Sequence, residues 1–180
     1  RYFQTALPLL EASHEYSEDL CLVRFSMAFS MLATGHTDSA LYYARKGKSM
    51  YTNAMNQRDP GPWLCLITGN IHQIGENYDS AEYYYREGIK VTEKFNAPFA
   101  GVLFYGNLAA ILDKKNEMDS CIFYAQRSRT LCQKYKYKNF EVSVSGFLAG
   151  VYDKTNVDSA YKYIKIMVAA NEEVNNESRV

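Results

Sequence analysis

Four copies of a short polar phrase divide the chain into stretches in which small and apolar residues recur at helical spacing. Each phrase is an Asp, a Ser and a small residue, and the copies begin at Asp38, Asp79, Asp119 and Asp158, at steps of 41, 40 and 39 residues. An Asp or Ser at this place accepts hydrogen bonds from first-turn N–H groups and suits the positive end of the helix dipole. A period this regular predicts a repeat architecture, whose stacked units usually build a binding surface.

Each phrase predicts a helix behind it, and an apolar stretch upstream predicts a second helix. Behind the first phrase, Ala40, Ala44 and Gly47 fall on one helical face, where small side chains allow another helix to approach closely. The same reasoning predicts that Ala81 is deeply buried. Residues 2–16 read as the second helix of an earlier unit. The other predicted helices, with no strands, cover roughly 21–34, 38–55, 62–75, 79–95, 99–115, 119–136, 141–154 and 158–174.

Tyrosines occupy two kinds of position in this pattern. One set stands four residues after each Ser and is predicted to pack between units with its hydroxyl at the rim: Tyr43, Tyr84, Tyr124 and Tyr163. A second set does not share the repeat position throughout and is predicted to be freer to bind a partner: Tyr83, Tyr85, Tyr135 and Tyr137.

The segment from Gly69 to Ala81 carries a family resemblance. It keeps a Gly in the first helix, a Tyr before the Asp and an Ala in the second helix, and so is similar to a tetratricopeptide repeat (TPR). The first-helix small residue maps to Ala28, Gly69, Ala109 and Ala149. The Tyr-rich style further resembles the sensory and regulatory TPR regions of Bacteroidetes regulators, in which such arrays precede a histidine-kinase or DNA-binding portion.

The resemblance implies an all-α fold, a right-handed α-solenoid of about four helix-turn-helix hairpins. The implied units of this single superhelical domain are 20–57, 61–97, 98–138 and 139–175, with 1–19 ending an earlier unit of a longer protein. The pattern departs from the family in its longer period, in an aromatic placed one position early, and in His72 where a Tyr is usual. Armadillo and HEAT hairpins have a closer period but lack the Tyr-Asp-x-Ala turn.

Composition narrows the classes of function. Twenty basic residues balance 20 acidic ones, which gives no electrostatic footprint for nucleic acid or an anionic membrane. No apolar run reaches the length of about 18 residues that a membrane span needs. The chain opens on Arg1 and shows no signal peptide. The sequence leaves two locations open, the periplasm and the cytoplasm.

Cysteine and histidine spacing indicates no metal site, cofactor site or catalytic set. The four cysteines form no Cys-x-x-Cys pair, and they are expected to act as small buried apolar residues. The histidines lie in three different units, and His72 is expected to pack in place of the usual Tyr. The sequence therefore predicts a protein that is not an enzyme and needs no cofactor.

The resemblance places the ligand on the first helices, which line the concave face in this family. Transferred through the small-residue position, the candidate peptide-binding residues are Phe25, Phe29, Asn70, Gln73, Asp113, Lys114, Asp153 and Lys154. The two phenylalanines could instead belong to the core, and the Asp-Lys pairs could be solvated helix ends. Only Asn70 matches the family's clamp for a C-terminal carboxylate, which argues against chaperone tails as partners.

The sequence thus predicts a non-catalytic module that binds a protein or peptide, as the sensory or scaffolding region of a larger signalling or transcriptional regulator. The alternative is a self-association module, a homodimer that controls attached output domains. The two hypotheses differ in what is buried, because a dimer would cover a terminal unit or an outer helix face over more than about 1,000 Å².

Overall fold

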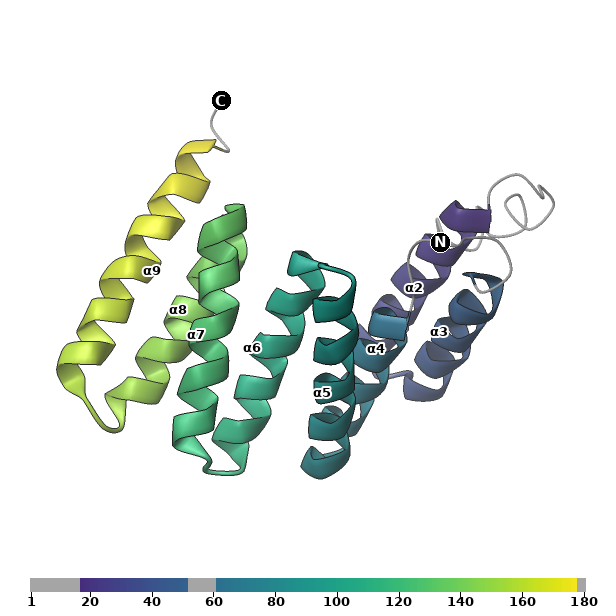
Figure 1. Cartoon of the computed structure of the whole chain (residues 1–180), viewed down its shortest axis with the longest axis horizontal. Helices are drawn as coiled ribbons and strands as arrows, with labels where there is room; N and C mark the ends of the chain where they lie inside the picture. The colour runs from purple at the N-terminus through teal and green to yellow at the C-terminus, as the bar shows by residue number, and fades with distance from the viewer. Residues whose placement is uncertain (1–16, 52–60, 178–180) are drawn as a thin grey trace. The chain divides into compact units, whose positions relative to one another are not determined.

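The computed structural model describes residues 17–51 and 61–177, and every regular element within them is an α-helix (Figure 1). The all-helical prediction is confirmed for this part of the chain. The predicted opening helix at 2–16 and the predicted end of a helix at residues 52–55 lie outside it. The elements are α2 (Ser17–Ala33), α3 (Thr37–Tyr51), α4 (Gly61–Ile74), α5 (Tyr78–Lys94), α6 (Pro98–Lys114), α7 (Met118–Tyr135), α8 (Lys138–Asp153) and α9 (Val157–Glu177).

Consecutive helices pair as helix-turn-helix hairpins. Helix α2 packs on α3, α6 on α7 and α8 on α9, and the close contact of Gly69 with the Tyr85 ring joins α4 to α5. The chain forms two compact units that meet in sequence after Val91, near the end of α5. Unit 1 holds α2 to α5, and unit 2 holds the last residues of α5 with α6 to α9. The predicted single superhelical domain and its internal boundaries stay predictions.

Three hairpin turns end the first helix in the same way. In the α4–α5 turn, the N–H of Asn77 donates to the carbonyl of His72 at 2.9 Å, and the N–H of Glu76 donates to that of Gln73 at 3.1 Å. This pair of bonds is the Schellman motif, which requires a left-handed residue just after the helix. The left-handed residues of the three turns are Gly35, Glu76 and Asn116, with φ of 79°, 56° and 60°.

The helices after the turns each begin one residue before the position that the sequence suggested. The Oδ1 atom of Asn77 accepts a hydrogen bond from the N–H of Ser80 at 3.2 Å, and Asn156 caps Ser159 in the same way at 2.9 Å. Asp79 and Asp158 lie inside the first turn. The capping role assigned to them was therefore wrong, although a carboxylate in the first turn still suits the dipole.

Small residues pack where the two helices of each hairpin cross. Ala28, Gly69, Ala109 and Ala149 on the first helices are all buried. On the second helices, Ala40, Ala81, Cys121 and Ala160 are buried, and the predicted burial of Ala81 is confirmed. The crossings hold the helix backbones close together and so set the spacing of the side chains around them.

Recurring tyrosines stack on the first helix of their own hairpin. The rings of His72 and Tyr84 lie parallel with centroids 5.4 Å apart, and those of Tyr152 and Tyr163 do the same at 5.4 Å. Tyr124 stacks on Tyr105 at 6.1 Å. The expectation that His72 packs in place of a Tyr is confirmed. Both partners of each ring pair belong to one hairpin, so these pairs do not show the expected packing between hairpins. Tyr163 does show it, because its hydroxyl lies 3.4 Å from Nε2 of Gln126 on α7 and the Arg129 guanidinium of α7 lies 5.7 Å from its ring centroid.

Candidate binding surfaces

Phe25 and Phe29 differ in their surroundings within unit 1. Phe25 is buried in a core cluster with Ala28, Leu32 and Ile67, and its ring lies against the backbone of Gly47. Phe29 is half-buried and meets the Trp63 ring edge-on, with centroids 6.0 Å apart. Phe25 therefore follows the core alternative that the sequence left open, and only Phe29 retains partly exposed apolar surface.

Asn70 and Gln73 face a buried tyrosine of their own hairpin. The Tyr85 hydroxyl lies 2.7 Å from Oδ1 of Asn70 and 2.6 Å from Oε1 of Gln73. A hydroxyl has a single hydrogen, so the amides share it or one of them turns its NH₂ group toward the oxygen. Burial raises the pKa of Tyr85 above its ordinary value, and the phenol stays protonated. Tyr85 is 0% exposed, so the prediction that it is available to a partner is wrong.

Two of the four polar candidates in unit 2 pair with each other. Nζ of Lys154 lies 3.3 Å from Oδ1 of Asp113, which joins the ends of α6 and α8. Lys114 and Asp153 are exposed to solvent. An ion pair this exposed contributes little to stability, about 0–1 kcal/mol, so both charges could be given up to a ligand at small cost.

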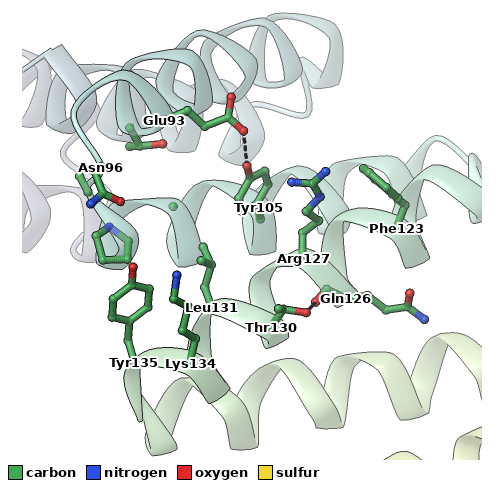
Figure 2. A pocket seen from close by; sticks show the side chains of 14 residues that line it. Glu93, Asn96, Tyr105, Phe123, Gln126, Arg127, Thr130, Leu131, Lys134 and Tyr135 are labelled. Carbon is green, nitrogen blue, oxygen red and sulfur yellow. Dashed lines mark hydrogen bonds between the residues drawn. The ribbon is translucent and has the colours of Figure 1, made fainter.

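An open groove that sequence reasoning missed lies in unit 2 and is called here the α6–α7 groove (Figure 2). Its volume is about 590 Å³, within the range of sites for small ligands and short peptide segments. It is bounded by the last residues of α5, the start of α6 and one face of α7. The lining residues are Thr92, Glu93, Asn96, Ala97, Pro98, Gly101, Tyr105, Phe123, Gln126, Arg127, Thr130, Leu131, Lys134 and Tyr135.

The floor of the α6–α7 groove is closely packed and carries a hydrogen-bonded tyrosine. A Cβ on Gly101 would lie 3.0 Å from the Leu131 side chain, so glycine lets the two helices approach here. The Tyr105 hydroxyl donates a hydrogen bond of 2.5 Å to Oε1 of Glu93. Burial and the Glu93 carboxylate raise the pKa of Tyr105 to about 12, so at neutral pH the phenol remains a donor.

The edge of the α6–α7 groove presents aromatic rings beside cations. Phe123 is 50% exposed, and the Arg127 guanidinium lies 5.2 Å from its ring centroid. Nζ of Lys134 lies 5.2 Å from the centroid of the Tyr135 ring, and the Tyr137 ring stacks on the Tyr135 ring with centroids 6.0 Å apart. Tyr135, predicted to be available to a partner, is half-buried and lines the groove. Figure 2 shows the Arg127 and Lys134 side chains on the same side of α7.

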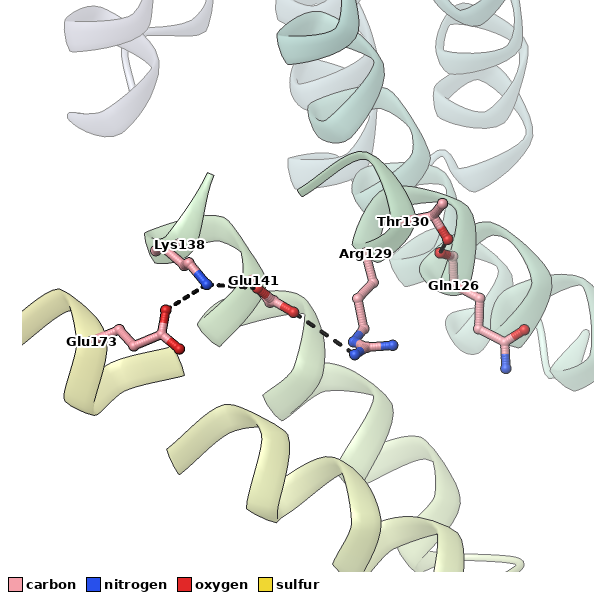
Figure 3. Close-up of polar contacts among 6 residues, drawn as sticks. All are labelled: Gln126, Arg129, Thr130, Lys138, Glu141 and Glu173. Atoms are coloured by element: carbon pink, nitrogen blue, oxygen red, sulfur yellow. Dashed lines mark hydrogen bonds and ion pairs between the residues drawn. The ribbon is translucent and has the colours of Figure 1, made fainter. Parts of the chain in front are cut away.

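A chain of charged groups fixes the helices on the other side of unit 2 (Figure 3). Nζ of Lys138 lies 2.5 Å from Oε2 of Glu173 and 4.0 Å from Oε2 of Glu141. Nη2 of Arg129 lies 3.7 Å from the other oxygen of Glu141, whose side chain is buried. The buried carboxylate is compensated by two cations, and the chain ties α7, α8 and α9 together.

Two kinds of reactive site, a metal-binding cluster and an activated buried thiol, are not found among the described residues. In the ranges 17–51 and 61–177, no three His, Cys, Asp or Glu side chains are placed to hold a metal ion. Burial raises the pKa of the Cys121 and Cys132 thiols to about 11, which disfavours the reactive thiolate. Among the helices described, none is both long and apolar enough to cross a membrane.

The paired helices, their small-residue crossings and their turns define a TPR-like helical solenoid fold, and comparison with solved structures agrees. The aspartyl phosphate phosphatase F of Bacillus subtilis matches with a TM-score of 0.80 at 14% identity, over 97% of this chain and 45% of that one. BtubC of P. vanneervenii matches with a TM-score of 0.75 at 16% identity, over 95% and 70%.

A third similar structure has a TPR sensor by its own description. It is a signal transduction ATPase with numerous domains from Pyrococcus horikoshii, matched with a TM-score of 0.58 at 16% identity over 96% of this chain and 34% of that one. The present chain thus spans less than half the length of the first and third of these proteins. No protein-family model and no curated protein sequence matches the chain.

Proposed function

We propose that this chain is a non-catalytic protein- or peptide-binding module, the sensory or scaffolding region of a larger signalling or transcriptional regulator. The observation that carries the proposal is the α6–α7 groove, which is open, about 590 Å³ in volume and lined by aromatic rings, cations and hydrogen-bond donors. Aromatic residues and Arg are enriched where proteins bind partners, because they supply large contact area and directed bonds.

The similar structures support the same class of function. The Pyrococcus horikoshii protein combines a TPR sensor with an ATPase, so a fold of this kind serves as the sensing part of a larger chain there. The resemblance of the repeats to Bacteroidetes regulatory regions points the same way. The first-helix residues that stay accessible are proposed as secondary contact positions within each unit, Phe29 in unit 1 and Lys114 and Asp153 in unit 2.

Blocking the α6–α7 groove is expected to abolish peptide capture. Thr130 is exposed on α7 and lines the groove, so Thr130→Trp fills the space without entering the core. Peptides selected from a phage-displayed random library on the unaltered chain should bind Thr130→Trp at least about tenfold more weakly, by fluorescence anisotropy. Asn139→Trp, at an exposed position outside the groove, is the matched control and should bind normally. Failure to enrich any peptide would refute the proposed function, and equal binding by Thr130→Trp would refute the site.

The outer face of α9 supports the second candidate function, self-association. Its exposed apolar residues follow the 4-3-4 spacing of a helix-packing stripe: Val157, Tyr161, Ile164 and Val168. At the position of Ile164, helix α7 carries Ala125, which is buried beside Phe140 and Val144 of α8. On α7 this face is covered by the next helix, α8. On α9 no described helix covers the same face, and a second copy of the chain is the proposed occupant.

If α9 mediates a dimer, Ile164→Glu should shift the chain toward the monomer. Each symmetric interface then contains the added charge twice, and the dissociation constant is expected to rise by about tenfold or more. Sedimentation equilibrium measures the shift, with Ala169→Glu, exposed on α9 but outside the stripe, as the control. A chain that is monomeric at all accessible concentrations excludes this function.

A further inference from the structure

Each unit contains a hollow lined by equivalent residues of the second helix of a hairpin. In unit 2 this hollow is the α6–α7 groove. The hollow of unit 1, called here the α3 hollow, has a volume of about 560 Å³, and its described lining residues are Asp38, Leu41, Tyr42, Arg45, Lys46 and Ser49. Aligned through Asp38 and Asp119, Tyr42 corresponds to Phe123, Lys46 to Arg127 and Ser49 to Thr130.

The side chains at these positions also share a geometry. Tyr42 is 55% exposed and Phe123 is 50% exposed, and each meets the next tyrosine edge-on at 5.3 Å or 5.1 Å. In both, the cation four residues later lies over the exposed ring, Lys46 at 5.8 Å and Arg127 at 5.2 Å. Because neither aromatic contributes to a core, packing gives no reason for this recurrence.

The cations of the two hollows have no carboxylate partner within the described residues. None of Arg45, Lys46, Arg127 and Lys134 takes part in an ion pair there. On α5, by contrast, the exposed aromatic Tyr83 is followed by Glu87, which forms an ion pair of 2.6 Å with Lys90. The cations beside the exposed rings of α3 and α7 are therefore available to a ligand. On α5 the equivalent position is Glu87, whose charge is already paired with that of Lys90.

We propose that the α3 hollow and the α6–α7 groove each bind an acidic peptide segment, with carboxylates at the cations and methylene groups on the exposed ring. The proposal names the ligand class for the peptide-binding function argued above and rests on it. Lys46 or Arg127 meets a carboxylate of the peptide and donates a charge-assisted hydrogen bond to it. A nucleic acid is disfavoured because the chain carries 20 basic and 20 acidic residues and so has no net positive charge to bind a run of phosphates.

The test uses a short peptide in which Glu alternates with Gly and Ser, and an identical peptide with Gln in place of Glu. Titration of the whole isotopically labelled chain should perturb backbone NMR signals of α3 and α7 with the Glu peptide and not with the Gln peptide. Lys46→Gln should weaken the response of α3 alone, and Arg127→Gln that of α7 alone, each by about two- to fivefold. Lys165→Gln removes an exposed cation of α9 outside both hollows and should leave both responses unchanged.

Each alternative outcome decides against the proposal. Equal responses to the Glu and Gln peptides, or no response to either, exclude recognition of acidic segments. A single-stranded oligonucleotide that perturbs α3 and α7 more strongly than the Glu peptide makes nucleic acid the ligand class. In all three cases the random-library selection on the unaltered chain, followed by the comparison with Thr130→Trp, still decides separately whether the chain binds peptides.

Discussion

Tyr85→Ala is expected to lower the free energy of unfolding by about 3–5 kcal/mol, the usual cost of truncating a fully buried aromatic side chain to Ala. The buried Tyr85 ring fills the space beside Gly69 of α4. Because glycine has no side chain, nothing at position 69 fills that space once the ring is removed. Its hydroxyl also engages the amides of Asn70 and Gln73, which lose that partner in the variant.

Chemical denaturation followed by far-UV circular dichroism measures this effect. Tyr83→Ala is the matched control, because Tyr83 lies two residues away on α5 and is 59% exposed. The control is expected to change stability by no more than about 0.5 kcal/mol. Similar denaturation curves for both variants would show that Tyr85 is not the core residue described above.

Gly69→Ala is expected to destabilise the chain by about 1–3 kcal/mol, although Ala normally favours a helix over Gly by about 1 kcal/mol. A Cβ at Gly69 would lie 2.4 Å from Cε1 and 2.7 Å from Cδ1 of Tyr85. The ring cannot turn aside cheaply, because its hydroxyl is held at the far end by Asn70 and Gln73.

Gly150→Ala gives the control with the opposite sign. Gly150 lies within α8, and a Cβ there meets nothing within 4 Å, so Ala should stabilise the chain by about 1 kcal/mol. Thermal melts of the two variants compare them directly. A Gly69→Ala protein that melts at or above the unaltered temperature would show that the α4–α5 crossing has room to relax.

The helices could be predicted from the sequence because their signals are local. A polar phrase, a small residue at each crossing and an apolar stretch of helical length lie within one hairpin, so their meaning does not depend on distant contacts. The misplaced caps show the limit of this reasoning. Asn77 and Asn156 cap as well as Asp does, and the phrase alone could not decide between neighbouring polar residues.

The burial of Tyr85 was missed because recurrence was used as the only sign of packing. Its counterparts on α3 and α7 are Ala44 and Ala125, so a tyrosine there looked like an exception available to a partner. The signal that could have corrected this lies on the facing helix. Gly69 stands where the other hairpins have Ala28 and Ala109, and the missing side chain makes room for the Tyr85 ring.

The candidate surfaces depended on contacts that no local pattern contains. The α6–α7 groove needs side chains from α5, α6 and α7 in one place, and Glu93 reaches Tyr105 only through the packing of these helices. The Asp113–Lys154 pair likewise joins two hairpins. One signal was present in the sequence, namely the aromatic residues Tyr42, Tyr83 and Phe123 at the repeat period, and the structure shows that all three are exposed.

The Gly69–Tyr85 exchange also bears on how an array of this kind can grow by duplication and recombination. A crossover that joined α4 to α3 or α7 in place of α5 would set Gly69 opposite Ala44 or Ala125 and leave a void. The reciprocal product would set Tyr85 opposite an Ala and overfill the crossing. A breakpoint inside the α4–α5 hairpin is therefore expected to destabilise the product, whereas one in the connections between hairpins keeps the matched pair intact. For an array of this kind, the whole hairpin is therefore the segment that can be exchanged without disturbing a crossing.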